Sequence, residues 1–121
     1  MATVNFIPES NQSISAMKAV IDYCLQQKKV ADEENGRRLV SGVNCNGENA
    51  FTEFMATKTA HHKKGGMNFY HYVQSFSPAE SVTAEQVHEI GLAFAKKAWS
   101  GHEVLVTTHT DAAHLHNHFV I

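Results

Sequence analysis

Hydrophobic and polar residues alternate along this chain with two different periods. Apolar residues recur every three or four positions in three segments, the spacing of amphipathic helices, and these segments begin near Ser13, Glu48 and Thr83. Short apolar runs bounded by turn residues lie between them and predict β-strands. The predicted strands cover residues 4–7, 39–45, 68–76, 103–108 and 114–121.

The order of these elements, β-α-β-α-β-α-β-β, indicates the fold class. The last two strands follow one another across a short turn at 110–113, so we expect them to pair as an antiparallel hairpin. Strands and helices in this order predict an α+β fold, a largely antiparallel β-sheet with helices packed on it. The chain has no internal repeat and no linker, so residues 1–121 are predicted to form a single domain.

The third predicted helix has the clearest pattern of the three. Thr83 and Gln86 have the spacing of a capping box, in which each side chain accepts a hydrogen bond from the other residue's backbone amide. The apolar face predicted for this helix consists of Val87, Ile90, Gly91, Phe94 and Ala98.

Composition narrows the class of protein. With 121 residues, 43% of them hydrophobic and 18% charged, the chain fits a soluble globular protein rather than a disordered one. No apolar run approaches the roughly 20 residues of a membrane span. Two cysteines exclude a disulfide framework and a cysteine-based zinc site, so we expect a reducing, cytoplasmic setting. The net charge of −2 does not indicate a nucleic-acid-binding protein.

The unusual feature of the composition is its histidines. Nine are present, and five of them lie between His102 and His118. Because side chains alternate along a strand, His114, His116 and His118 share one face of the last predicted strand, with roughly 7 Å between alternate residues. His109 ends the neighbouring strand and can supply a further ligand. Three histidine ligands are typical of a catalytic metal site with open positions, and the alternative is a polar surface strand.

The last strand also carries a family resemblance. Residues 109–121, HTDAAHLHNHFVI, resemble the metal-binding motif of relaxases, the mobilisation nucleases of conjugative plasmids and integrative elements. That motif has His-x-Asp, a short gap and then a His-x-His pair on a strand. The resemblance implies that His109, His116 and His118 bind the metal, with His114 as a hydrogen-bonding neighbour.

Two earlier segments resemble the same family in the expected order. Residues 19–29, AVIDYCLQQKK, are similar to the helix that carries the nucleophilic tyrosine, and residues 70–78, YHYVQSFSP, to the family's His-and-Ser-Phe strand. The family motif usually continues with an Asn beyond the last strand, whereas this chain stops at Ile121. The chain therefore resembles the N-terminal, nuclease part of a longer relaxase.

The resemblance implies a reaction, a cofactor and partners. Relaxases cut one DNA strand at a transfer origin by tyrosine attack on a phosphodiester, which leaves a 5′-phosphotyrosyl link. The implied partners are single-stranded DNA at that origin and accessory relaxosome proteins, in the cytoplasm of a bacterium. The implied cofactor is a divalent ion, with Mn²⁺ or Mg²⁺ in use, and histidine ligands also suit Ni²⁺, Co²⁺ or Zn²⁺. Since only a neutral imidazole coordinates, we expect metal affinity to fall below about pH 6.

Three tyrosines are candidates for the nucleophile. On a helical wheel Tyr23 points away from the apolar stripe of the first predicted helix, as a nucleophile must. Its spacing alone is also that of an ordinary, half-exposed helical aromatic residue, and the resemblance decides in favour of the nucleophile. Tyr70 and Tyr72 share one face of a strand with Gln74 and Phe76, a setting typical of core or stacking aromatics.

Several polar residues have two interpretations each. Asp111 is either a turn residue or a carboxylate that orients a metal-binding imidazole. His71 is either a structural histidine or a contact to the tyrosine or the phosphate. A group of basic residues near the end of the tyrosine helix either contacts the DNA backbone or forms a solvated turn. This group consists of Lys28, Lys29, Arg37 and Arg38, and the predicted surface residues are His61, His62, Lys63 and Lys64.

Two other functions fit parts of the same pattern. A rolling-circle replication initiator or a transposase of the same nuclease class would use the same ligands and tyrosine on a different DNA target. A non-enzymatic metal-binding or DNA-binding module would form no phosphotyrosyl adduct. The mildly acidic charge departs from the expectation for a DNA enzyme, and a basic C-terminal continuation would account for it.

Overall fold

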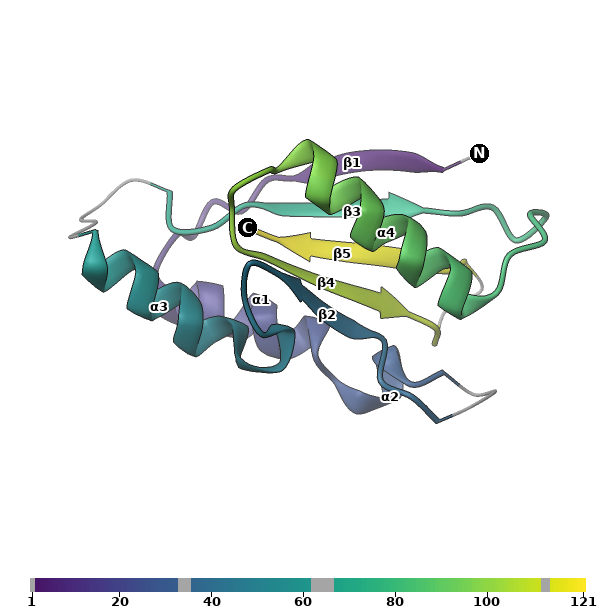
Figure 1. The fold of residues 1–121 in the computed structure, drawn as a ribbon, viewed down its shortest axis with the longest axis horizontal. Helices are drawn as coiled ribbons and strands as arrows, with labels where there is room; N and C mark the ends of the chain where they lie inside the picture. Colours follow the sequence, from purple (N-terminus) through teal and green to yellow (C-terminus); the bar gives the residue numbers. More distant parts are fainter. Residues whose placement is uncertain (1, 33–35, 62–66, 112–113) are drawn as a thin grey trace.

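A computed structural model describes residues 2–32, 36–61, 67–111 and 114–121 of the chain. Five strands form one sheet in the spatial order β1-β3-β5-β4-β2, and every neighbouring pair is antiparallel (Figure 1). The strands are β1 (Thr3–Ile7), β2 (Val40–Val43), β3 (His71–Ser75), β4 (Val104–His109) and β5 (His116–Val120). The predicted surface residues His62, Lys63 and Lys64, and residues 112–113 of the predicted turn at 110–113, lie outside the described residues.

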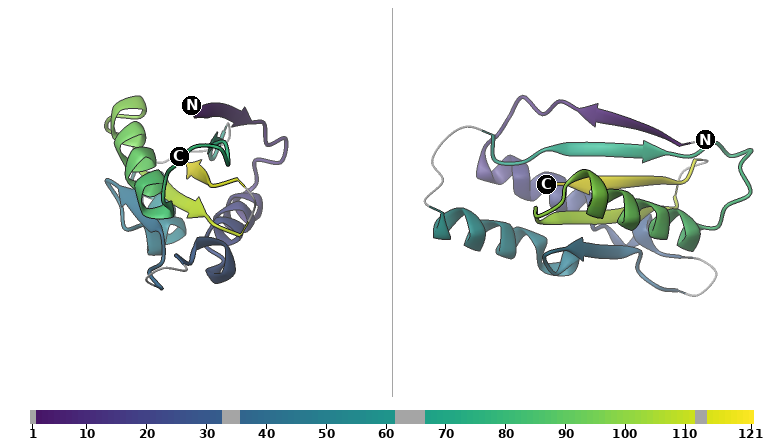
Figure 2. Two further views of the ribbon diagram at one scale, coloured as in Figure 1. Left: turned by 90° about the vertical axis from the view of Figure 1, so that its right-hand side faces the viewer. Right: turned by 45° about the horizontal axis from the view of Figure 1, so that its top comes forward.

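Helices cover both faces of this sheet, with α4 on one face and α1 with α3 on the other (Figure 1, Figure 2). The helices are α1 (Ile14–Cys24), α2 (Gln27–Val30), α3 (Ala50–Ala60) and α4 (Ala84–Ala98), with a 3₁₀ turn, η1 (Gly47–Asn49). The predicted α+β fold is confirmed, and α2 and η1 are additions to the predicted order. No helix among the described residues is long and apolar enough to cross a membrane.

The β4–β5 hairpin lies inside the sheet and is buried on both faces. On the side of α1 and α3 the core consists of Met17, Ile21, Cys24, Ala50, Phe54, Phe69, Leu105 and Val120. On the side of α4 it consists of Val43, Ala95, Val104, Val106 and Phe119. Because side chains alternate along β5, His116 and His118 lie on the same face as Val120, toward α1.

Most element boundaries agree with the pattern of the sequence. Ser13 caps α1 by accepting from the amide of Ala16 at 3.1 Å, and Thr83 with Gln86 forms the predicted capping box of α4. The strands β2 and β3 are shorter than the predicted segments. The chain turns after β2 at Asn44, which has a φ of 59°, and Tyr70 and Phe76 keep backbone hydrogen bonds to Ile121 and Leu115 beyond the two ends of β3. The predicted β4–β5 hairpin is confirmed.

The buried face of α4 agrees only in part with the predicted one. Val87 and Gly91 are buried as predicted, and Phe94 packs against the core. Ile90 is 42% exposed and Ala98 is also exposed, whereas His88 and Ala95 are buried. The inner face of this helix packs over polar side chains as well as apolar ones, so the spacing of hydrophobic residues alone does not define it.

A buried polar network lies between α4 and the sheet. His88 Nδ1 lies 2.9 Å from Thr108 Oγ1, and His88 Nε2 lies 2.7 Å from Ser41 Oγ. The Thr108 hydroxyl donates to Asn117 Oδ1, and Asn117 Nδ2 donates to Gln74 Oε1 at 2.9 Å. The network crosses β2, β4, β5 and β3 and therefore fixes the relative positions of the strands that carry the histidines.

Gly91 permits the close packing of α4 on this network. A Cβ atom at this position would lie 2.4 Å from Asn117 Nδ2 and 2.7 Å from Asn117 Cγ. We expect Gly91→Ala to lower the free energy of unfolding by about 1–3 kcal/mol in chemical denaturation, because the crowded network must shift. In an Asn117→Ala background the same substitution should cost nothing, and a Gly91→Ala chain more stable than its parent would contradict the prediction.

Candidate active site

Three of the histidines meet at one end of the β4–β5 hairpin. His109 is the last residue of β4 and pairs with His116, the first residue of β5, while His118 lies two residues further along the same face. The ring centroids are 4.2 Å apart for His109 and His118, 5.0 Å for His116 and His118, and 5.1 Å for His109 and His116. One nitrogen of each ring lies within 4.8 Å of the other two, close enough for all three to bind one metal ion.

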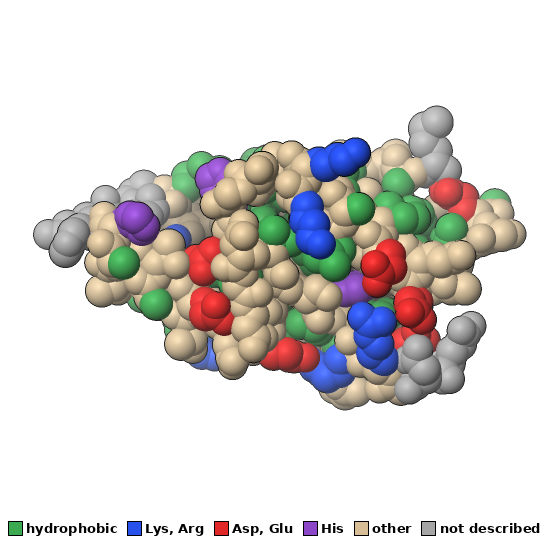
Figure 3. Space-filling model, viewed as in Figure 1, with side chains coloured by type: hydrophobic (Ala, Val, Ile, Leu, Met, Phe, Trp, Pro, Cys, Tyr) green, Lys and Arg blue, Asp and Glu red, His purple; other side chains and the backbone are tan. Residues whose placement is uncertain are grey.

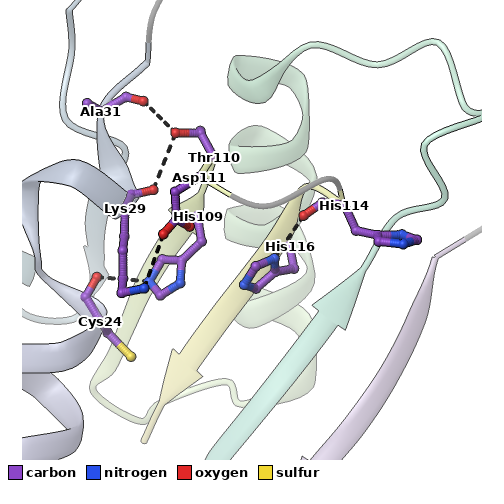
Figure 4. A network of polar contacts seen from close by, with 8 residues as sticks. All are labelled: Cys24, Lys29, Ala31, His109, Thr110, Asp111, His114 and His116. Carbon is purple, nitrogen blue, oxygen red and sulfur yellow. Dashed lines mark hydrogen bonds and ion pairs between the residues drawn. The ribbon is translucent and has the colours of Figure 1, made fainter.

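Two of these imidazoles have one nitrogen engaged by a backbone carbonyl. His109 Nε2 donates to the carbonyl of Cys24 at 3.1 Å, and His116 Nδ1 donates to the carbonyl of His114 at 3.0 Å (Figure 4). Since a carbonyl only accepts, the neutral rings keep their lone pairs on His109 Nδ1 and His116 Nε2. A metal ion needs such a lone pair, so both rings are held in the tautomer that coordinates.

His118 offers the third nitrogen. Its Nδ1 lies 2.8 Å from His71 Nε2, while its Nε2 is buried and has no hydrogen-bond partner among the described residues. A buried polar atom without a partner destabilises a fold unless a bound group satisfies it. A divalent ion shared with His109 and His116 would satisfy it, so the donor set fits the metal that the sequence predicts.

Burial lowers the pKa of two of the three histidines. The pKa of His109 is lowered to about 4, chiefly by burial, although its hydrogen bond to Cys24 acts in the opposite direction. The pKa of His118 is lowered to about 2 by burial and then by the neighbouring histidines. At these two positions protons compete with a metal only in stronger acid, so the expected loss of affinity near pH 6 is wrong for them.

The metal-free chain should lose stability in acid. An unfolded chain protonates His109 and His118 near the ordinary pKa of about 6.5, whereas the folded chain keeps both neutral to a lower pH. Below about pH 6.5 the unfolded state therefore binds more protons, and the free energy of unfolding falls until the folded-state pKa is passed. The free energy of unfolding, measured by chemical denaturation, should be lower at pH 5 than at pH 7 by on the order of 1–2 kcal/mol for each ring. His109→Gln should reduce this difference between the two pH values. A chain that gains stability in acid would contradict the conclusion that His109 and His118 stay neutral in the folded chain.

Tyr23 lies beside the histidine cluster. It belongs to the last turn of α1 and is 43% exposed. Its ring centroid lies 5.6 Å from that of His109 and 6.0 Å from that of His118, and both contacts are edge-on. Tyr23 thus lies on a side of α1 that faces away from the apolar stripe of this helix and toward the histidines. The Tyr23 ring, with its hydroxyl group, stays accessible to a substrate.

The other two tyrosines lie elsewhere. Tyr72 projects from β3 toward the side of α4, where its ring centroid lies 4.9 Å from that of Trp99 and 5.1 Å from that of Phe6. Tyr70 is 43% exposed, with its ring centroid 6.5 Å from that of Phe6. Of the three tyrosines, all of which lie in described segments, Tyr23 is the one with ring contacts to the histidine cluster.

Lys29 connects Tyr23 with Asp111. Its ammonium nitrogen lies 4.8 Å from the centre of the Tyr23 ring. The same nitrogen lies 3.1 Å from Asp111 Oδ2 (Figure 4). The hydrogen bond to Asp111 raises the pKa of Lys29, so a positive charge is held beside the phenol. The Asp111 carboxylate therefore accepts a hydrogen bond from Lys29 and holds it in place. This role differs from both roles predicted for Asp111.

The remaining basic candidates have other contacts or are exposed. Arg38 donates to Glu48 at 2.7 Å and holds the start of β2 against η1. Arg37 lies 3.5 Å from Glu85, and Lys28 is exposed on α2. Of the four basic residues singled out in the sequence, Lys29 is the one at the tyrosine.

An open depression of about 540 Å³ lies in front of the cluster. Its lining residues are Tyr23, Val73, Ser75, His114, His116 and His118. The exposed ring of His114 is turned away from His109 and His116 (Figure 4). On the opposite side of the molecule, the described residues of the α4 face mix acidic and basic side chains (Figure 3), so charge does not favour DNA binding there.

Two contacts at the site have no signal in the sequence. Cys24 contacts His109 through its backbone carbonyl. The Cys24 side chain belongs to the apolar stripe of α1, so its residue type does not indicate this contact. Glu9 follows Pro8 in a loop, and its carboxylate lies 3.1 Å from His71 Nδ1. Both contacts depend on how distant segments pack, and no local pattern encodes that packing.

Comparison with known proteins identifies relatives of the chain. Residues 23–121 match the family model described as relaxase, MobA/VirD2-like, nuclease domain. The protein Rlx of Staphylococcus aureus is 43% identical over 81 residues, which are 67% of this chain and 25% of that protein. The group II intron-interrupted relaxase LtrB of Lactococcus lactis subsp. cremoris is 31% identical over an alignment of 115 positions, and the alignment covers 74% of this chain and 20% of that protein. The chain thus spans a quarter or less of the length of these relatives, and no solved structure is significantly similar to it.

Proposed function

Since the chain belongs to the MobA/VirD2-like relaxase nuclease family, we propose that it nicks one DNA strand at a transfer origin by attack of the Tyr23 hydroxyl on a phosphodiester. The observation that carries this proposal is the position of Tyr23, with its ring centroid 5.6 Å from that of His109 and 6.0 Å from that of His118. A nucleophile and a group of metal-binding side chains are thereby within reach of a single phosphate. The relative named as a relaxase favours this function over a replication initiator or a transposase.

The histidine cluster is proposed to hold a divalent ion. His109 Nδ1, His116 Nε2 and His118 Nε2 supply three neutral nitrogen ligands, a set that leaves coordination positions open. When bound, such an ion draws electron density from the scissile phosphate and offsets its negative charge. Nitrogen ligands suit Ni²⁺, Co²⁺ or Zn²⁺ better than Mg²⁺, and Mn²⁺ or Mg²⁺ are proposed for use in the cell, where availability decides.

The Tyr23 phenol needs activation because a protonated phenol is a weak nucleophile at neutral pH. Lys29, held by Asp111, keeps a positive charge 4.8 Å from the ring centre, where it favours negative charge on the phenol oxygen. In the reaction the phenol loses its proton, its oxygen bonds to phosphorus, and the bond from phosphorus to the 3′ oxygen breaks. The 3′ oxygen takes up a proton, which gives a 5′-phosphotyrosyl link and a free 3′-hydroxyl.

The shape of the site favours a single strand as the substrate. The depression beside Tyr23 opens to solvent and is lined by Val73 and Ser75 of β3. A flexible single strand can bring one phosphate to both Tyr23 and the histidines, whereas a stiff, paired duplex resists this approach. We therefore propose single-stranded DNA at a transfer origin as the partner, with accessory relaxosome proteins, in a bacterial cytoplasm.

Cleavage should require single-stranded or locally melted DNA. Single-stranded oligonucleotides that tile the DNA around the gene are labelled at their 3′ ends, so that a 5′-phosphotyrosyl adduct keeps the label on the protein. With Mn²⁺ we expect an adduct that survives denaturing electrophoresis, from one strand only, and at most about a tenth as much from the same sequence in a linear duplex. Equal cutting of the duplex would argue against a relaxase, and no adduct with any oligonucleotide would favour a non-enzymatic module.

A further inference from the structure

The carboxylate of Glu9 reaches the histidine cluster through His71. Glu9 Oε1 lies 3.1 Å from His71 Nδ1, and His71 Nε2 lies 2.8 Å from His118 Nδ1. The rings of His71 and His118 are stacked, with centroids 5.0 Å apart and planes inclined by 29°. This series of side chains ends at His118 Nε2, which is buried and without a hydrogen-bond partner in the described part of the chain.

The direction of these hydrogen bonds follows from the carboxylate. An ionised carboxylate only accepts, so the His71 proton lies on Nδ1 in this contact. With His71 neutral, its single proton lies on Nδ1, so His71 Nε2 accepts and His118 Nδ1 donates to it. The proton of His118 is thereby held on Nδ1 and its lone pair on Nε2, the atom that a metal bound to the cluster would use.

The loop that carries Glu9 is anchored in place. Gln12 Nε2 donates to the carbonyl of Glu9 at 3.1 Å, and Gln12 Oε1 accepts from the amides of Asn68 and Phe69 at 2.7 Å and 3.1 Å. The segment between β1 and α1 is thus hydrogen-bonded to residues that precede β3, the strand that carries His71. The Glu9 side chain is 29% exposed and that of His71 is 9% exposed, so their contact is largely shielded from water.

We propose that Glu9 is a positioning residue of the metal site, which acts through His71 to hold His118 in the tautomer that binds the ion. The inference rests on the proposed function, because it presupposes an ion at His109, His116 and His118. It adds a residue that precedes the segment 23–121 matched by the family model. Glu9 contacts neither the substrate depression nor Tyr23, so its effect is expected on metal affinity.

Titration calorimetry with Co²⁺, in the absence of DNA, tests the proposed effect of Glu9 on metal affinity. We expect the parent chain to bind one ion and Glu9→Ala to bind it about 10-fold more weakly, the lower end of the effects measured for outer hydrogen-bond partners of metal ligands. Glu9→Gln should have an intermediate affinity, because an amide can accept from His71 but can also turn and donate to it. Glu89→Gln is the control, since it removes an exposed carboxylate of α4.

Nitrogen NMR of the imidazole rings separates an effect on the tautomer from a loss of structure. In the metal-free parent we expect the His118 proton on Nδ1, and in Glu9→Ala a mixture with Nε2 protonated in an otherwise unchanged backbone spectrum. Unchanged tautomer and affinity in Glu9→Ala would overturn the inference and leave the metal site standing. A parent chain that binds no Co²⁺ would overturn both.

A competing arrangement is tested by the same titration. Cys24, His71 and His118 also offer ligand atoms within 4.8 Å of one another, and an ion held there would make His71 a ligand. Burial raises the pKa of Cys24 to about 12, which disfavours the thiolate that such an ion needs. We expect the Co²⁺ spectrum to lack a sulfur-to-metal charge-transfer band, and the appearance of that band would overturn the inference.

Discussion

Tyr23→Phe is expected to abolish the covalent attachment to DNA, with metal binding and the fold unchanged. The substitution removes only the phenol oxygen, and the ring keeps its edge contacts to His109 and His118. Without that oxygen no bond to phosphorus can form, so the adduct should fall on the order of a thousandfold or more. Electrophoresis of the labelled oligonucleotides measures the adduct, and calorimetry with Mn²⁺ or Co²⁺ measures metal binding.

Two matched variants control for the loss of a tyrosine hydroxyl. Tyr70→Phe and Tyr72→Phe make the same chemical change on residues that pack near Phe6, away from the histidines. Both should form the adduct with Mn²⁺ as the parent does. An adduct that persists in Tyr23→Phe and disappears in Tyr70→Phe or Tyr72→Phe would move the nucleophile to the region of β3 and refute the proposed site.

Local sequence patterns predicted the histidine cluster because its histidines lie close together in the sequence, on two strands joined by a short turn. Alternation along a strand puts His116 and His118 on one face, and the hairpin brings the end of one strand beside the start of the next. The register then pairs His109 with His116 directly. A few residues on either side of one turn determine this arrangement. Alternation also placed His114 on this face, and the resemblance to relaxases selected His109, His116 and His118.

The place of Tyr23 could be predicted only in part. A helical wheel indicates which way the side chain points relative to the apolar stripe, but not what lies on that side. The contact between Cys24 and His109 joins residues 85 positions apart, and it arises because α1 packs on the face of the hairpin that carries the histidines. Lys29 follows Tyr23 by six residues, and its ammonium lies over the Tyr23 ring. The contact between Cys24 and His109 belongs to tertiary structure, for which the chain offers no local signal.

The face of α4 was predicted only in part, for a related reason. Hydrophobic spacing assumes that the buried side of a helix is apolar, whereas His88 is fully buried and bonded to Ser41 and Thr108. Buried polar groups are tolerated when all of them find partners, and those partners come here from two strands distant in the sequence. The network passes through Asn117, which lies between His116 and His118 on β5, so the residues that break the apolar pattern also support the site.

Loss of one histidine ligand is the second large effect that we expect. His116→Ala should weaken the binding of Ni²⁺ or Co²⁺ by more than the 10–100-fold that loss of an outer partner typically costs, because a coordinate bond is removed. In the parent chain the affinities should follow nitrogen-ligand chemistry, with Ni²⁺ or Co²⁺ above Mn²⁺ and Mn²⁺ above Mg²⁺. Calorimetric titration of both chains at neutral pH measures these differences.

His114→Ala is the matched control for this ligand. It removes an imidazole from the same segment, but the ring is exposed and turned away from the cluster, and the backbone carbonyl that orients His116 remains (Figure 4). Because His116 is only partly buried, its loss should leave the cores on both faces of the sheet intact, so weaker binding cannot be attributed to unfolding. If His116→Ala and its parent bound Ni²⁺ equally, the ion would be held elsewhere and the histidine face of β5 would have no part in the reaction.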